Sequence, residues 1–166
     1  MAAIKNLKDL YLDGVKDLYS ACKQAVPVTE ELAAAAKNAD LKQALEASAK
    51  GTRDGMAQME KLARSHGEDA SGEHCKGMEG LVTEARKHAL EAEFADDEVQ
   101  DAAIIAQYQR LAHYAITGYG TLKAWAKRLD LAEDSKVLDE ATASTYEGDE
   151  TMTKIAVKGG VNKAAM

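Results

Sequence analysis

The chain has 166 residues, of which 46% are hydrophobic, 30% charged and 5% aromatic, so it has room for one compact domain and not for two of ordinary size. It contains a single proline and is rich in alanine, lysine and glutamate, which favours an all-α fold because these side chains lose little rotamer freedom in a helix. The formal net charge of −7 argues against nucleic acid and against an anionic membrane surface as partners.

The sequence also bears on the cellular compartment. Charged side chains occur throughout the first 25 residues, so no uncharged signal-peptide core is visible there. The uncharged run at residues 111–122 is much shorter than the ~20 apolar residues that a membrane-spanning helix needs. Cys22 and Cys75 form no CxxC pair, which argues against a disulfide framework and a zinc knuckle. We therefore expect a cytoplasmic protein with no membrane partner.

The N-terminal half predicts two helices. Residues 7–25 place apolar side chains three and four positions apart, the spacing of one helical face. Pro27 is expected to kink or interrupt this helix before the pattern resumes. A second apolar stripe at residues 41–62 predicts another helix, with Asp40 as its N-cap and Gly67 as its left-handed C-terminal cap.

The C-terminal half predicts a loop and three more helices. The polar, glycine-containing segment 68–76 is expected to be a surface loop, followed by a short helix at residues 77–91. The acidic residues 96–98 open a long helix that should end near Asp130, since acids at a helix start complement its dipole. A last long helix is expected at residues 132–157.

Together these elements predict a four-helix bundle with a crossover connection and one extra short helix. The bundle would occupy residues 1–157 as a single domain. Residues 158–166 show no apolar periodicity and are expected to form a flexible C-terminal tail.

Three runs of the chain, at residues 7–24, 74–85 and 101–129, resemble the YciE/YciF stress-protein family of ferritin-like bundles. The pattern HYxxxxYGTLxAWA at residues 113–126 is its most specific part, and the resemblance spans nearly the whole chain. It implies a ferritin-like four-helix bundle, frequently a homodimer, that bacteria produce under stress. The biochemical activity of this family is poorly defined.

Ferritin-like bundles usually hold two irons between carboxylates and histidines from all four helices, because two buried cations need several anionic oxygens. The resemblance shows that this chain has other residues at the usual ligand positions. These are Cys22 for a glutamate, Gly51 for the second glutamate of Glu-Glu-Thr, Gly55 for a histidine or glutamine, Ala112 and Ala115 for the glutamates of Glu-His-Tyr-Glu, and Thr145 within a glutamate-rich run. We therefore expect no bound metal and no other cofactor.

Small residues thus gather on the inner stripes near the middles of the four long helices, and this predicts a candidate ligand site. Small residues either permit close helix approach or leave a hole where the metals would lie. In one alternative, Tyr11, Met56, Tyr108 and Tyr119 lean inward and fill the space. In the other, an apolar small molecule occupies it. The candidate ligand-binding residues are Cys22, Gly51, Gly55, Tyr108, Ala112, Ala115, Tyr119, Thr145 and Gly148.

No catalytic residue is expected. Cys22 would need a neighbouring base to act as a nucleophile, and no histidine lies at a suitable spacing on its helix. A metal-binding His113 would need at least two partners, and its neighbours supply none, so a histidine bonded to a nearby side chain is favoured. His74 and Cys75 are adjacent, but neighbouring residues on a loop rarely bind the same metal ion. Cys75 is expected to be a buried thiol.

Three functional hypotheses follow. The preferred one is a non-enzymatic, stress-associated ferritin-like bundle with a degenerate metal site. The alternative is a small-molecule binding protein that uses the vacated bundle centre as an apolar pocket. A di-iron oxidase or iron-storage protein follows from family analogy alone, and fold analogy does not establish function.

Overall fold

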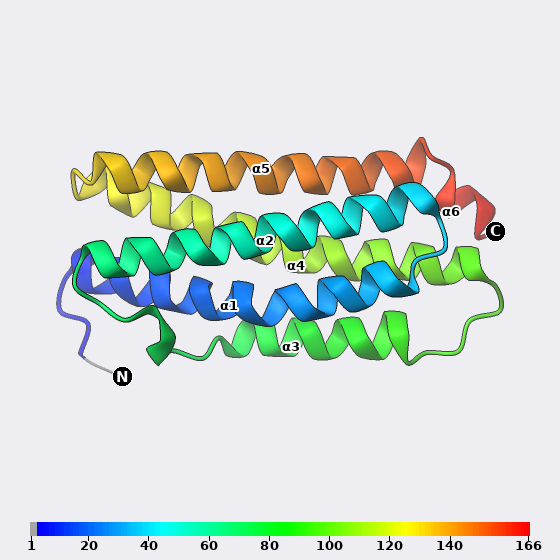
Figure 1. Cartoon of the computed structure of the whole chain (residues 1–166), viewed down its shortest axis with the longest axis horizontal. Coiled ribbons are helices and arrows are strands. Elements are labelled where there is room, and N and C mark those ends of the chain that lie inside the picture. Colours follow the sequence, from blue (N-terminus) through cyan, green and yellow to red (C-terminus); the bar gives the residue numbers. More distant parts are fainter. Residues whose placement is uncertain (1–2) are drawn as a thin grey trace.

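Long helices dominate the computed structural model, which describes residues 3–166 and contains no strand in that range. Four of them run along the long axis of the molecule (Figure 1). These are α1 (Leu7–Ala35), α2 (Ala39–Ser65), α4 (Asp97–Arg128) and α5 (Ala132–Val157). The shorter elements are the 3-10 turn η1 (Ala70–Gly72), the helix α3 (Lys76–Ala85), the π-helical segment η2 (Arg86–Leu90) and the helix α6 (Val161–Ala164). The all-α prediction is confirmed.

The order of the helices gives the bundle a crossover topology. Helices α1 and α2 form one antiparallel pair, and α4 and α5 form another (Figure 1). Packing of α1 against α4 and of α2 against α5 closes the bundle. The long connection from α2 to α4 contains α3, which packs against α1 and α4. The sequence prediction of a crossover bundle is therefore confirmed.

Side-chain caps begin three of the long helices. Asn6, Asn38 and Asp96 each accept a hydrogen bond from the backbone N–H three residues ahead. The predicted cap of α2, Asp40, is wrong, because Asn38 takes that position and Asp40 falls in the first helical turn. There its negative charge still complements the helix dipole.

Pro27 does not interrupt α1, which continues through it to Ala35. The missing N–H removes one helical hydrogen bond, at a cost of about 3 kcal/mol in a helix interior. Val28, directly after the proline, and Leu32, about one turn further on, are fully buried in the core. Burial of this face stabilises the helix enough to offset the lost bond, since most helical stability in proteins comes from packing.

The structure also extends the bundle beyond the boundary predicted at residue 157. Gly160 adopts a φ of +83°, a left-handed conformation that favours glycine, and turns the chain into α6. Val161, the first residue of α6, is buried, and α6 packs against α4 and α5. The segment predicted as a tail thus contributes to the core. The short helix predicted at residues 77–91 is likewise divided into α3 and η2.

Glycines bring α1 and α4 close together near one end of the bundle. A Cβ atom on Gly14 would lie 2.8 Å from Leu122 Cδ2, and one on Gly118 would lie 2.9 Å from Leu18 Cδ1. A larger residue at either position would therefore displace a core leucine. Here small residues do permit close helix approach.

Candidate functional site

A cavity of about 430 Å³ lies at the centre of the bundle, with lining residues from all four long helices. Gly51, Ser144 and Glu147 belong to its lining and are exposed, so the cavity opens to solvent between α2 and α5. Every candidate ligand-binding residue predicted from the sequence lines it: Cys22, Gly51, Gly55, Tyr108, Ala112, Ala115, Tyr119, Thr145 and Gly148. The structure thus brings the nine residues together, and their binding of a ligand stays a prediction.

Two tyrosines of α4 occupy part of this space. The hydroxyl of Tyr119 fills the place that a side chain on Gly55 would take. The hydroxyl of Tyr108 lies 3.4 Å from where a Cβ on Gly148 would be. Both glycines therefore make room for a tyrosine, whereas a Cβ on Gly51 would meet no atom within 4 Å.

The alternative in which four side chains fill the bundle centre is therefore wrong in part. Tyr108 and Tyr119 do lean inward, but Tyr11 lies near the end of the bundle, where its hydroxyl donates to Asp134 Oδ2 at 2.8 Å. Met56 does not line the cavity. Open space remains between the two inward tyrosines and Gly51.

Cys22 lies on the α1 wall of the cavity with 3% of its surface exposed. Its Sγ is 3.3 Å from the Tyr119 hydroxyl. Burial raises the pKa of the thiol to about 11, and the hydrogen bond with Tyr119 only partly opposes this effect. The thiol is therefore protonated at neutral pH and lacks the thiolate character of a nucleophilic cysteine.

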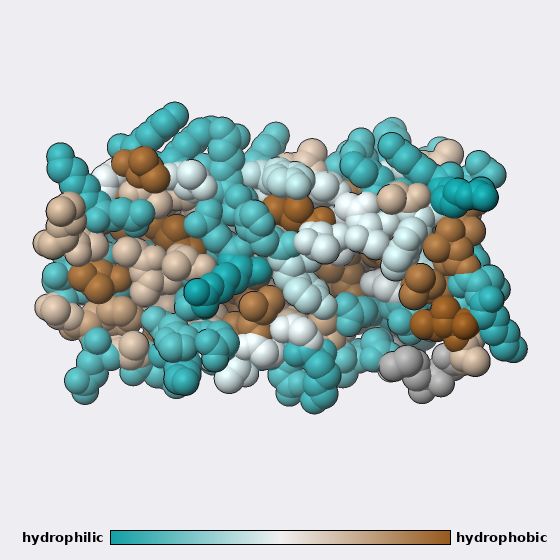
Figure 2. Space-filling model, turned by 180° about the vertical axis from the view of Figure 1, so that it is seen from behind, coloured by the Kyte–Doolittle hydropathy of each residue, from teal (hydrophilic) through white to brown (hydrophobic). Residues whose placement is uncertain are grey.

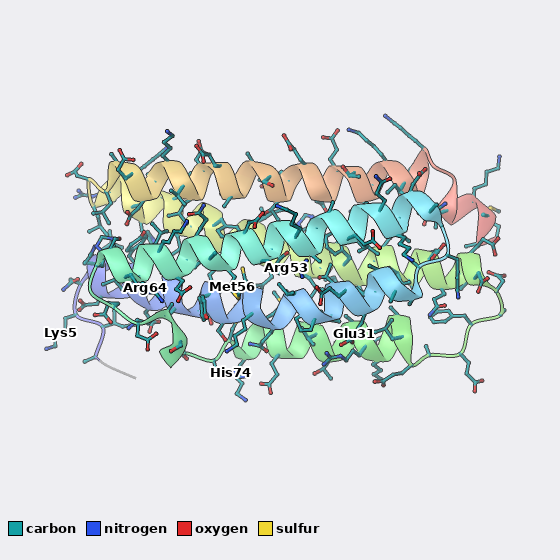
Figure 3. All side chains as sticks on the ribbon, viewed as in Figure 1. Lys5, Glu31, Arg53, Met56, Arg64 and His74 are labelled. Carbon is teal, nitrogen blue, oxygen red and sulfur yellow. The ribbon has the colours of Figure 1, made fainter. Side chains whose placement is uncertain are left out.

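The remaining candidates lie away from the cavity. His113 is on the surface, with 61% of its side chain exposed, and its Nε2 is 3.1 Å from Asp149 Oδ2, so it is bonded to a neighbour as predicted. Cys75 is buried and caps α3 by accepting from the Met78 backbone N–H. His74 is exposed on the side of the bundle away from α5 (Figure 3). His74 and Cys75 therefore share no site.

The cavity lining does not fit a di-iron centre. Its carboxylates are Asp54 on α2 and Glu140 and Glu147 on α5, and its residues on α1 and α4 include none. A ferritin-like centre draws carboxylate and histidine ligands from all four helices. Over residues 3–166, no group of three or more histidine, cysteine, aspartate or glutamate side chains is placed to hold a metal ion.

These three carboxylates are the charged part of the lining, and the sequence prediction missed them. Asp54, Glu140 and Glu147 are exposed acidic residues on helices. In the sequence such residues look like any solvated helical face. Only the packing of α2 against α5 shows that they border a common opening.

A second polar cluster, also missed, lies near the end of the bundle where α1 begins and α2 ends. Asp134 at the start of α5 accepts from the Tyr11 hydroxyl, and its Oδ2 is 2.6 Å from His66 Nε2. Lys8 Nζ lies 2.7 Å from the other ring nitrogen, His66 Nδ1. Burial raises the pKa of Tyr11 well above its ordinary value, and burial also lowers the pKa of Lys8. Because all four groups are paired, the cluster links α1, the C-terminal end of α2 and α5.

The surface gives no sign of a membrane-spanning segment. In the described part of the chain, none of the helices combines the length and the apolar character needed to cross a bilayer. Figure 2 shows the reverse face as a mixture in which hydrophilic side chains separate smaller groups of apolar ones.

Comparisons with known proteins agree on one family. Residues 6–166 match the family described as "Domain of unknown function (DUF892)". Protein YciF of Escherichia coli (strain K12) is 32% identical over 163 residues, which is 98% of this chain and 96% of that protein. Two solved structures have a TM-score of 0.86 and 31% identity over 93% of this chain. They are the E. coli stress protein YciF and YcfI of Rhodopseudomonas palustris, of which 96% and 97% are covered.

Proposed function

This chain belongs to the DUF892 family, and from that premise we propose that it is a non-enzymatic, stress-associated bundle protein whose metal centre has degenerated. The stress association is carried over from the E. coli relative, which is described as a stress protein. One observation supports the loss of the metal centre. Only two of the four long helices contribute carboxylates to the lining at the bundle centre. A homodimer in a bacterial cytoplasm belongs to the same proposal, and sedimentation analysis tests the dimer.

The side chains around the cavity also support a non-catalytic role. The lining contains no histidine, so its serine, threonine and cysteine side chains have no imidazole base beside them. Cys22 is the strongest nucleophile by type, yet burial holds its thiol in the protonated form. The lining therefore supplies neither a nucleophile with a neighbouring base nor a ligand set for a metal ion that could activate water.

Metal loading tests this proposal. The purified chain would be incubated anaerobically with excess ferrous iron or manganese, desalted and analysed for metal, with a ferritin treated in parallel as the positive control. We expect far less than one metal ion per chain. About two ions per chain, lost when Glu140→Gln and Glu147→Gln are combined, would contradict the proposal and support an oxidase or storage protein.

The cavity favours a second candidate function, the binding of a small and largely apolar molecule. Its volume of about 430 Å³ falls within the ~300–1,000 Å³ usual for ligand pockets. Because the cavity is open to solvent, its apolar walls are accessible to water, and an apolar molecule that covers them is favoured by the hydrophobic effect. A ligand that fills the cavity would therefore stabilise the bundle.

A melting experiment with 2-naphthalenemethanol as the probe tests this second function. At a hundredfold excess over its Kd, a ligand stabilises the fold by ~2.7 kcal/mol, which corresponds to a rise of about 5 to 11 °C in Tm for a chain of this size. Gly51→Leu should abolish the shift, because its side chain would enter the cavity. Gly80→Leu is the matched control, since Gly80 is exposed on α3 and its Cβ also would meet nothing within 4 Å. An equal shift in both variants would place the probe elsewhere.

A further inference from the structure

We propose that the ligand of the central cavity is an amphiphilic cation, with its apolar part inside the bundle and its positive charge at the mouth between α2 and α5. This inference rests on the proposed small-molecule function and assigns the chemical class of the ligand. It follows from the distribution of charge over the cavity lining.

The charged residues of the lining all have the same sign. Asp54, Glu140 and Glu147 are the acidic side chains of the lining, and among the residues that the structure describes it includes no lysine, arginine or histidine. The chain as a whole carries 21 lysines and arginines against 28 acidic residues, so a shortage of basic residues does not explain this. The cavity therefore presents a negative potential to an approaching molecule.

The three carboxylates stand on both sides of the mouth. Glu140 and Glu147 are seven residues apart on α5, about two helical turns, and thus share one face. Asp54 borders the opening from α2, where Lys50 pairs with it at 2.8 Å. Within residues 3–166, neither Glu140 nor Glu147 forms an ion pair, so both are free to pair with a ligand cation.

The interior of the cavity, in contrast, is uncharged. Its walls there include Leu18, Ala112 and the tyrosines at positions 108 and 119. Burial raises the pKa of both tyrosine hydroxyls, so they stay neutral at physiological pH. A charge placed deep inside would lose its hydration without finding a partner, which is costly. The cation of the ligand therefore remains at the mouth, and its apolar part enters.

Three probes of matched size test the inference on the full chain. They are 2-naphthylmethylamine, protonated at pH 7, the neutral 2-naphthalenemethanol and the anionic 2-naphthoate, each titrated and followed by calorimetry or NMR. We expect the amine to bind about fivefold more tightly than the alcohol, which corresponds to one exposed ion pair at the upper end of the usual range, and the naphthoate to bind most weakly. The preference for the amine should shrink in 0.5 M NaCl, because salt screens exposed charges.

Variants separate the charge effect from the cavity itself. Combining Glu140→Gln with Glu147→Gln should bring the Kd of the amine to within about twofold of that of the alcohol and leave the Kd of the alcohol unchanged. The matched control combines Glu98→Gln with Glu133→Gln, since these exposed carboxylates lie on α4 and α5 outside the lining, and it should keep the fivefold preference.

The failure of this inference is distinguishable from failure of the proposed function. If the alcohol binds and the amine binds no better, or if the naphthoate binds most tightly, the cationic ligand is wrong while small-molecule binding stands. If none of the three binds at millimolar concentration, both are wrong. An amine preference that survives Gly51→Leu would place the binding outside the cavity and would also overturn the inference.

Discussion

Gly51 lines the open side of the central cavity, where this position of α2 contributes no side chain. It lies in the middle of α2 and is exposed, and a Cβ there would meet no atom within 4 Å. Glycine in a helix interior costs roughly 0.5–1 kcal/mol relative to alanine. Gly55, one turn further on, has a packing reason, because the Tyr119 hydroxyl takes the place of its side chain. Gly51 has no such neighbour, and it lines the open side of the cavity.

The first prediction concerns the stability of Gly51→Leu. We expect this variant to raise the free energy of unfolding by more than the ~1 kcal/mol that helix propensity alone supplies, because the leucine also buries apolar surface in the cavity. Gly80→Leu measures the propensity contribution alone. Urea denaturation of both variants gives the comparison. A Gly51→Leu chain less stable than the natural one, by the ~1–3 kcal/mol typical of overpacking, would show that the space is closed.

The second prediction concerns pH and Cys22. Because the folded state holds the pKa of this thiol at about 11, the unfolded chain ionises first as the pH rises. The contribution of Cys22 to stability is thus fully present below about pH 9 and is lost between about pH 9 and 11. Urea denaturation from pH 8 to 11 should show a steeper loss of stability for the natural chain than for Cys22→Ala. Parallel curves would contradict the raised pKa.

Nine residues of the cavity lining could be predicted from the sequence, about a third of the whole lining. Cys22, Gly51 and Ala112 fall on apolar stripes, and the family resemblance implies that metal ligands usually occupy these positions, so the two signals together identify them. The carboxylates at the mouth, such as Glu140, lie at stripe edges, where the sequence does not distinguish a solvated face from a shared opening. Their position depends on how α2 and α5 pack, which no local pattern encodes.

At the scale of helices, buried carboxylates link the helices by hydrogen bonds near both ends of the bundle. Near one end, Asp134 joins α5 to Tyr11 of α1 and to His66, directly after α2. Near the other end, Asp101 of α4 accepts the backbone N–H groups of Lys37 and Asn38, at 2.9 and 2.7 Å. These ties hold the four helices in register while the middle stays open.

The third prediction tests the Asp134 tie. Asp134→Asn weakens two charge-assisted hydrogen bonds in a half-buried cluster, so we expect it to lower the free energy of unfolding by about 1–3 kcal/mol. Tyr11→Phe removes one of the two bonds and should cost about 1 kcal/mol. In a double-mutant cycle the two changes should be coupled by at least ~0.5 kcal/mol. Additive effects would mean that the hydrogen bond contributes nothing to stability.

The four long helices could be predicted from the sequence, but the continuity of α1 through Pro27 and the N-cap of α2 could not. Pro27 was expected to disturb α1 because the local rule counts only the missing hydrogen bond, whereas burial of the neighbouring face decides the outcome. Asp40 was expected to cap α2 because aspartate is a good cap, yet Asn38 is equally good and lies two residues earlier. The Asp134 cluster was beyond local reasoning, since Tyr11 lies 123 positions away in the chain.

At the scale of the whole molecule, the chain has the fold of its family, and we propose that its metal centre has degenerated. The similarity to the two solved structures covers 93% of this chain at a TM-score of 0.86. Carboxylates remain at the bundle ends and at the cavity mouth, and the walls of α1 and α4 have none. We therefore propose that the bundle centre binds an organic molecule and not a pair of metal ions.

Crystallography of the protein grown with both ferrous iron and 2-naphthylmethylamine, with data recorded at the iron absorption edge, tests that claim most directly. We predict density for the naphthyl group between α2 and α5, its amine beside Glu140 or Glu147, and no anomalous peak at the bundle centre. A pair of anomalous peaks about 3.5–4 Å apart in the cavity, the spacing of a two-metal site, would contradict the account.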